Sequence, residues 1–202
     1  MFKELRNSIK ELEGYVPVKE RLPILQALVA YIQEKKDEGD SINLNFVCTH
    51  NSRRSHLSQI WAQTMAAYFQ ISKVYCYSGG TEATALFPKV LETLEDSGFK
   101  TFKFAKGDNP IYFIKYAPNC QSIIGFSKTY DDVFNPESNF AAIMTCGHAD
   151  ENCPFIPGAE KRIPMTFDDP KDYDGTELQT QKYRERSLEI ASQLYYVFSK
   201  IV

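Results

Sequence analysis

Residues 45–62, with the sequence NFVCTHNSRRSHLSQIWA, predict a strand, a tight loop and a helix in that order. A mainly apolar run leads directly into Cys48, the next six residues are small, polar or cationic, and a helical pattern begins at Ser55. A loop between a strand and a helix N-terminus directs successive backbone N–H groups, and the positive end of the helix dipole, into one concavity that favours an oxyanion. The stretch therefore predicts an anion-binding loop that begins at Cys48.

Cys48 is the candidate nucleophile of this loop. The N–H groups that favour an oxyanion also stabilise a thiolate, so the sulfur should be nucleophilic at neutral pH. Arg54 can bind two oxyanion oxygens with its planar guanidinium group, and Ser55 can donate a hydrogen bond to the thiolate. A structural cysteine beside a surface arginine pair is the alternative, but the apolar strand, the turn residues and the helix start together favour the nucleophile. The other candidates for oxyanion binding are Thr49, His50, Asn51, Ser52 and Arg53.

The composition is that of a globular protein with a substantial core. The chain has 202 residues, of which 43% are hydrophobic, and this suits one domain with an added element. A net charge of −3 gives no reason to expect binding to nucleic acid or to an anionic membrane. No apolar run approaches the roughly 20 residues that span a bilayer and no signal-type segment follows Met1, so we expect a cytoplasmic protein. Five cysteines in such a chain suggest reduced or chemically active thiols rather than a disulfide scaffold.

Residues 1–40 predict two helices ahead of the anion-binding loop. Apolar residues recur at helical spacing in 2–12 and again in 22–32. We interpret this part as an amphipathic helical hairpin, an N-terminal extension to a main domain at residues 41–202. It could cover an apolar patch of that domain, mediate dimerisation or cap the active site.

Strand and helix patterns alternate along the main domain. This rhythm is typical of a three-layer α/β/α fold with a central, mainly parallel sheet. In such folds ligands bind beyond the carboxyl ends of the strands, where Cys48 falls. The expected elements are strands at 74–77, 140–145 and 162–164, helices at 55–69, 88–97 and 176–201, and a β-hairpin at 111–126.

A second cysteine, Cys146, follows a short predicted strand and should reach the same edge of the sheet as Cys48. Cys153 lies seven positions further on, with one histidine and two acids between them. A zinc site is one alternative, but the two-residue spacing typical of zinc ligands is absent and the chain has only three histidines. Two inert thiols are the other alternative. The remaining cysteines, Cys76 on a strand and Cys120 in a turn, are expected to have no role in chemistry.

Asp169 is the candidate general acid. It directly precedes Pro170, and a residue before proline is held out of the helical region, so its carboxyl group stays on a loop. A turn or cap carboxylate is the alternative for any Asp-Pro pair. Asp168 is expected either to orient Asp169 or to be solvated.

Three of these segments, in the same order, resemble a known superfamily. Residues 48–55, CTHNSRRS, resemble the Cys-X5-Arg-Ser loop of the low-molecular-weight protein tyrosine phosphatases and of the arsenate reductases built on the same fold. Residues 145–154, TCGHADENCP, resemble the redox cysteine segment of thioredoxin-coupled arsenate reductases, and Asp169-Pro170 resembles the acid loop of the superfamily. The resemblance covers residues 42–202, and it implies the fold described above. Compared with the compact form of the family, the aromatic segment 105–127 is longer than the usual connection.

The loop departs from the family pattern at Arg53, where many relatives have cysteine or a neutral residue, and at His50, where they often have glycine. Some arsenate reductases of this type hold a potassium ion with an asparagine of the loop, an acid on the next helix and a serine after the second strand. Asn51 and Ser78 match that set, but Gln59 stands in the acidic position. We therefore expect no bound metal.

The resemblance implies an arsenate reductase with a relay of three thiols. Cys48 attacks arsenate, Arg54 stabilises the charge and Asp169 protonates the departing oxygen. Cys146 then forms a disulfide with Cys48 and releases arsenite. Cys153 then attacks Cys146, which frees Cys48 and forms a Cys146–Cys153 disulfide. Thioredoxin, the expected external reductant, reduces this disulfide.

Two other functions remain open. A phosphotyrosine phosphatase would use only Cys48, Arg54 and Asp169, although Lys171 and Asp172 stand where such enzymes usually have aromatic residues. A phospho-ligand-binding or redox-sensing module without turnover is the second, and its N-terminal helices would recruit a partner. The intact set of cysteine, arginine and aspartate argues against that module.

Overall fold

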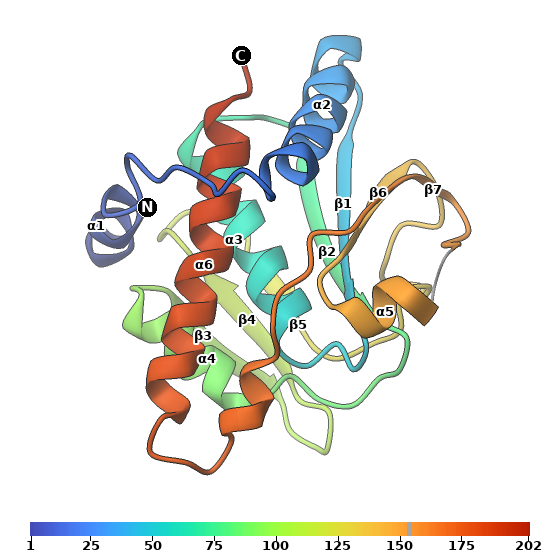
Figure 1. Cartoon of the computed structure of the whole chain (residues 1–202). Helices are drawn as coiled ribbons and strands as arrows, with labels where there is room; N and C mark the ends of the chain where they lie inside the picture. Colours follow the sequence, from blue (N-terminus) through green and yellow to red (C-terminus); the bar gives the residue numbers. More distant parts are fainter. Residues whose placement is uncertain (153–154) are drawn as a thin grey trace.

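A parallel sheet of four strands forms the centre of the molecule (Figure 1). Its strands are, in spatial order, β2 (Val74–Gly80), β1 (Ile42–Cys48), β6 (Phe140–Met144) and β7 (Ala159–Ile163). The computed structural model describes residues 1–152 and 155–202. β6 is buried along its whole length, as expected for a strand that is covered on both faces. The prediction of an α/β fold with a parallel central sheet is confirmed.

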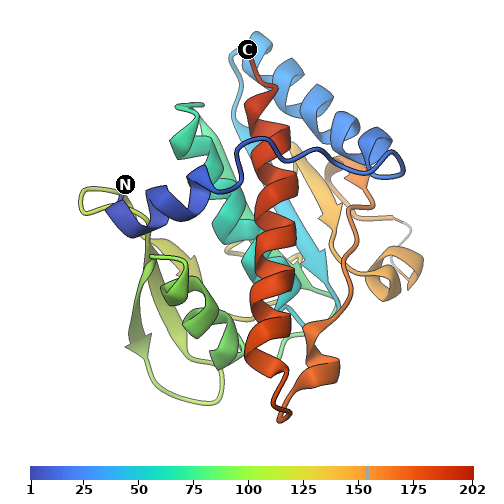
Figure 2. The ribbon, with the colours of Figure 1, turned by 60° about the vertical axis from the view of Figure 1, so that its left-hand side comes forward.

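Helices cover one face of the sheet in two layers. The helices of the described chain are α1 (Lys3–Lys10), α2 (Leu22–Glu38), α3 (Arg54–Tyr68), α4 (Pro88–Asp96), α5 (Gly147–Asn152) and α6 (Gln179–Ser199), with a 3₁₀ turn η1 (Pro170–Tyr173). α3 packs on β1 and β2, and α6 packs on α3 (Figures 1 and 2). Trp61, Tyr183 and Phe46 lie fully buried in the core between them. None of these helices combines the length and the apolar character that crossing a bilayer requires.

The other face of the sheet is covered by α5 and by the chain around Tyr130. Val47, Met144 and Ala149 belong to a second, smaller apolar cluster on this side, and Cys48 and Cys146 are part of it. The two candidate thiols therefore lie on the same face of the sheet, opposite the main core.

The aromatic segment after α4 forms a separate antiparallel sheet. Its strands, in order, are β3 (Lys100–Ala105), β4 (Ile111–Lys115) and β5 (Ile123–Gly125). Phe113 faces Ile124 across β4 and β5, so the predicted hairpin is confirmed. β3 is an additional strand on its outer side.

The two N-terminal helices are present, but they pack on separate parts of the domain, which corrects the interpretation as a hairpin (Figure 2). α1 lies against the end of α4, where a Cβ on Gly98 would be only 2.3 Å from the backbone nitrogen of Leu5. α2 instead packs on α6, β1 and β7, and Tyr31 donates a hydrogen bond to Glu160 at 2.8 Å. Each helix has its own apolar face, and the connection at 11–21 is long enough to let them separate.

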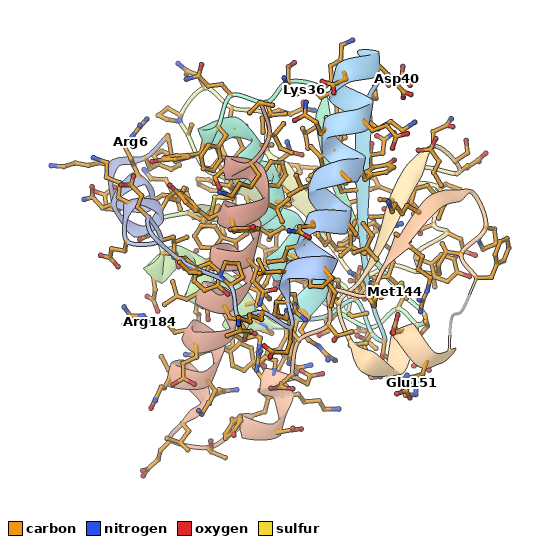
Figure 3. All side chains as sticks on the ribbon, turned by 45° about the horizontal axis from the view of Figure 1, so that its top comes forward. Arg6, Lys36, Asp40, Met144, Glu151 and Arg184 are labelled. Atoms are coloured by element: carbon orange, nitrogen blue, oxygen red, sulfur yellow. The ribbon has the colours of Figure 1, made fainter. Side chains whose placement is uncertain are left out.

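The strand order places the ends of β1 and β6 side by side. From β1 the chain continues to β2 on one side and later returns to β6 on the other, so the connections diverge at this edge. Val47 pairs with Met144 in register, and the Thr145 N–H donates to the Val47 carbonyl at 2.7 Å. Figure 3 shows Met144 beside α5. Cys48 and Cys146 therefore leave the sheet at neighbouring positions.

Candidate active site

Cys48 ends β1, and its side chain is only 3% exposed. Its Sγ lies 3.1 Å from the Oγ of Ser55, on the first turn of α3. Asn51 Nδ2 donates to the same Oγ at 2.8 Å, which leaves the serine hydroxyl hydrogen free to point at the sulfur. Ser55 is thus placed to stabilise a thiolate at Cys48.

The carbonyl oxygens of the loop are held by neighbouring segments. Because the C=O and N–H of one peptide unit point in opposite directions, the N–H groups of residues 49, 50, 51 and 53 face the other way. Gly80 allows this approach, since a Cβ there would be 2.6 Å from the Thr49 carbonyl oxygen. The loop therefore offers a row of N–H donors to an oxyanion. The donors to the loop carbonyls are Thr81 N to Cys48 (3.1 Å), Glu82 N to Thr49 (2.8 Å), Ser127 Oγ to His50 (2.9 Å) and Phe87 N to Ser52 (3.1 Å).

Arg54 joins the loop to the candidate acid. Its Nη2 lies 2.5 Å from Asp169 Oδ2, and its Nη1 donates to the Phe167 carbonyl at 2.9 Å. Its Nε is buried and has no partner in the described part of the chain, so this donor is available to an oxyanion. Asp169 has an extended backbone (φ −83°, ψ 121°), as predicted for a residue before proline. The small cavity at this point is lined by Cys48, His50, Ser52, Arg53, Arg54 and Asp169.

Cys146 lies close to the loop of Cys48. Its Sγ is 3.4 Å from the Oγ1 of Thr49, the residue that follows Cys48, and Cys146 is only 1% exposed. The same hydroxyl lies 3.4 Å from His148 Nδ1, and the Ala149 N–H points to the sulfur at 3.3 Å. The helix α5 begins directly after Cys146, in a segment for which the sequence analysis predicted no helix. Cys153, the third thiol of the predicted relay, lies outside the described residues.

The sequence and the fold are both similar to those of known enzymes. No protein-family profile matches the chain. Arsenate reductase 2 of Staphylococcus epidermidis is 26% identical over 140 residues, which cover 69% of this chain and 87% of that protein. An arsenate reductase structure from Archaeoglobus fulgidus has a TM-score of 0.53 at 19% identity, covering 78% of this chain and 99% of that one. A low molecular weight phosphotyrosine phosphatase structure from Vibrio cholerae has a TM-score of 0.53 at 15% identity, covering 79% and 95%.

The chain is thus similar in sequence to arsenate reductases, and it has the fold that low-molecular-weight tyrosine phosphatases and arsenate reductases share. The resemblance inferred from residues 48–55, 145–154 and 169–170 is thereby confirmed at the level of the superfamily, whose members are enzymes. Within the anion-binding loop, this chain departs from the common superfamily pattern at Arg53 and at His50.

Arg53 is one of these departures, and its side chain is not used as the sequence suggested. Its Nε donates to the Tyr183 hydroxyl at 2.5 Å and its Nη2 bonds the carboxylate of Asp174. The guanidinium carbon lies 4.1 Å from the centre of the Phe87 ring. These contacts engage Nε and Nη2 of Arg53 with other partners, so its guanidinium group is less free to bind an oxyanion than that of Arg54, although Arg53 lines the small cavity. His50, the other departure, is half exposed and lies 3.8 Å from Glu82.

The residues considered for a potassium ion are used within the protein. Asn51 Oδ1 accepts the Lys128 N–H at 2.9 Å, and Ser78 Oγ lies 3.2 Å from His56 Nδ1. Gln59, which supplies no negative charge, donates to a backbone carbonyl. The ammonium of Lys128 is itself buried close to these residues, 4.4 Å from the centre of an aromatic ring. This donor set does not fit a potassium ion, because a second cation would be repelled.

Lys128 lies next to the anion-binding loop, and sequence reasoning did not identify it. Burial lowers the pKa of its ammonium to about 8. Burial and the nearby Lys128 charge together lower the pKa of His56 to about 3, so this imidazole is neutral at physiological pH. A lysine between serine and threonine carries no local signal of burial, so only the tertiary structure shows it.

The two cysteines that were expected to have no chemical role lie on other elements. Cys76 is in the middle of β2, and burial raises the pKa of its thiol. Cys120 lies in the turn between β4 and β5, where its thiol donates to the Ala117 carbonyl. Both can serve as internal controls for the reactivity of Cys48.

Asp169 and Asp168 provide a test of the acid. Asp169→Asn should lower the hydrolysis of poorly activated phosphate esters by roughly 10²–10⁴-fold, the range for a positioned general acid, and should affect activated esters much less. Asp168→Asn is the control, because the Asp168 carboxylate is 96% exposed and pairs with Arg186 at 3.1 Å. Steady-state kinetics on phenyl and 2,4-dinitrophenyl phosphate measure both effects. A larger loss in Asp168→Asn would mean that the acid is assigned to the wrong residue.

Proposed function

We propose that this protein is an arsenate reductase that uses Cys48 as the nucleophile and Cys146 as the resolving thiol. The observation that carries the proposal is the position of the Cys146 sulfur, buried and 3.4 Å from the hydroxyl of Thr49 in the anion-binding loop. Ester hydrolysis needs one thiol at this place, whereas reduction of arsenate needs a second. The sequence relatives named arsenate reductase support the same activity.

The first step forms a bond between sulfur and arsenic. The Cys48 thiolate attacks the arsenic of arsenate, and one oxygen departs as water after Asp169 supplies a proton. Arg54 and the loop N–H groups stabilise the negative charge that remains on the arsenic-bound oxygens. The short contacts of Arg54 with Asp169 keep the charge-binding group and the acid next to one another.

The second step transfers electrons to arsenic. The Cys146 thiolate attacks Cys48 Sγ, and the electron pair of the sulfur–arsenic bond stays on arsenic, so As(V) leaves as arsenite, As(III). The product is a Cys48–Cys146 disulfide. In a third step Cys153 attacks Cys146, which frees Cys48 and leaves a disulfide for reduction by thioredoxin. This third step rests on the sequence alone, since Cys153 lies outside the described residues.

Hydrolysis of phosphate monoesters is the second candidate function. A cavity of about 600 Å³ adjoins Arg54 and Asp169, which is much more room than a tetrahedral oxyanion needs. Phe167 and Tyr173 both line it, but Phe167 is only 5% exposed, and most of the other lining residues are charged. The wall thus favours a polar ligand over a phosphotyrosine ring held between two aromatic side chains.

The proposed function is tested by arsenate-dependent oxidation of NADPH in the presence of thioredoxin and thioredoxin reductase. The same preparation is assayed with p-nitrophenyl phosphate. We expect NADPH oxidation that requires both arsenate and this protein. Ester hydrolysis without arsenate reduction would make the protein a phosphatase, and the absence of both activities would favour the phospho-ligand-binding or redox-sensing module.

A further inference from the structure

Two consecutive arginines hold opposite ends of the segment that carries the candidate acid. Arg54 bonds Asp169 at the start of the 3₁₀ turn η1, and Arg53 bonds Asp174 directly after its end. The turn is closed internally, because Asp169 Oδ1 accepts the Lys171 N–H at 3.1 Å and the Asp174 N–H donates to the Lys171 carbonyl at 2.9 Å. Displacing Asp174 would therefore displace Asp169.

The contact between Arg53 and Asp174 lies in a shielded and fully bonded setting. The Arg53 side chain is 11% exposed and that of Asp174 is 25% exposed. Asp174 Oδ1 accepts hydrogen bonds from the Tyr183 hydroxyl at 2.7 Å and from Gln179 Nε2 at 3.0 Å. Burial alone would raise the pKa of the Asp174 carboxyl, but these bonds and the Arg53 charge lower it below its usual value. A charge-assisted pair in such a setting is stronger than a surface ion pair.

The aromatic ring beneath Arg53 belongs to a residue that is bonded to the anion-binding loop. The Phe87 ring lies under the guanidinium group, and the Phe87 N–H donates to the Ser52 carbonyl at 3.1 Å. Tyr183, the other partner, is fully buried on α6. Arg53 and the Phe87 ring beneath it therefore connect Asp174 to the loop that carries Cys48, and they fix its position relative to that loop.

Arg54 alone is a poor anchor for the acid. It is also the side chain expected to bind the oxyanion, so its bond to Asp169 competes with the ligand. Asp169 must in addition carry a proton to act as an acid, and protonation weakens its bond to a guanidinium group. The Arg53–Asp174 pair neither has to bind the oxyanion nor has to gain a proton, so it can stay intact throughout the reaction.

We propose that Arg53 is a positioning residue that holds the general acid Asp169 in register with Cys48 by anchoring Asp174 at the far end of η1. The inference rests on the proposed function, in which Asp169 supplies a proton. It assigns a task to the position at which this chain departs from the common superfamily pattern.

The kinetic test uses Arg53→Met, with Arg53→Lys and Asp174→Asn as milder variants. Arg53→Met should lower kcat for phenyl phosphate by about 10- to 100-fold, part of the roughly 10²–10⁴-fold effect of an acid, and for 2,4-dinitrophenyl phosphate by less than about 3-fold. Arg53→Met combined with Asp169→Asn should be no slower than Asp169→Asn alone. Lys35→Met is the matched control, because it removes a partly buried cation on α2 from its pair with Glu160 on β7. Equal losses with both esters, or additive effects in the double variant, would overturn the proposal.

A second measurement needs no turnover, and it separates this inference from the proposed function. Backbone amide hydrogen exchange of residues 168–176 should be faster in Arg53→Met and Asp174→Asn than in the wild type and in Lys35→Met. Exchange in β1 and α3 should change much less. Unchanged exchange of residues 168–176 would overturn the proposal even in an active enzyme, whereas a protein that reduces no arsenate but shows the faster exchange would retain the anchor and lose only the proposed function.

Discussion

Cys48→Ser should abolish turnover of arsenate and of phosphate esters alike, with a loss on the order of 10⁴-fold or more, as for other nucleophile replacements. Both reactions begin with attack by the Cys48 sulfur, and a serine hydroxyl at the same place remains protonated and weakly nucleophilic. The side chain is buried beside Ser55 and the replacement is small, so the fold should persist. Steady-state assays with both substrates measure the loss, and thermal unfolding checks the fold.

The remaining thiols provide the control for this result. At pH 6.5 iodoacetamide should modify Cys48 faster than Cys76 or Cys120, and inorganic phosphate should slow the modification of Cys48 alone. Cys120→Ser should retain activity, because that thiol donates to a carbonyl of its own turn, away from the anion-binding loop. Labelling of Cys48 at the rate of the other thiols would contradict the anion-binding loop, and so would retained turnover in Cys48→Ser.

The sequence was sufficient for the elements that depend on local pattern. An apolar strand, a polar loop and a helical repeat are adjacent in residues 45–62, and the structure has β1, the loop and α3 there. The pairing of β4 with β5 is also local, since a short turn joins two β-branched and aromatic runs. Cys48, Arg54 and Ser55 could be placed together for the same reason.

Contacts between distant segments could not be predicted in the same way. The direction of the Arg53 side chain is decided by Phe87, Asp174 and Tyr183, which come from three separate parts of the chain. An adjacent arginine pair in an anion-binding loop suggests two ligands for the anion, and nothing nearby in sequence opposes that view. Asp174, five positions after Asp169, was the one available signal of a second anchor.

The same limit applies to the N-terminal helices and to the segment after Cys146. The apolar stripes of α1 and α2 show which face of each helix is buried but not what it is buried against. α5 has six residues, fewer than two turns, so it lacks a helical repeat of apolar residues that could be recognised. Cys146 was nevertheless placed at the correct edge, because strand order in a parallel sheet brings carboxyl ends together.

Cys146→Ser should separate the two candidate activities. Multiple-turnover reduction of arsenate should fall by about 10³-fold or more, because the disulfide that releases arsenite cannot form, while ester hydrolysis should change by less than about 3-fold. Serine fits the space of the buried thiol, and Cys146 contacts the loop through Thr49 rather than through Arg54 or Asp169. NADPH-coupled arsenate assays and p-nitrophenyl phosphate assays on the same preparation measure the two effects.

A count of the free thiols of the protein tests the same step independently of the activity assays. The chain has five cysteines, and one turnover of arsenate without thioredoxin should leave two fewer reactive thiols in the unfolded wild-type protein. Cys76→Ser is the matched control and should lose two thiols as well, since it removes a buried sulfur that lies outside the relay. In Cys146→Ser the disulfide between Cys48 and Cys146 cannot form, so these two thiols should not be lost as a pair. An equal fall of both activities in Cys146→Ser would instead assign the buried thiol a structural role in the apolar cluster behind the loop, and the redox relay would have to be abandoned.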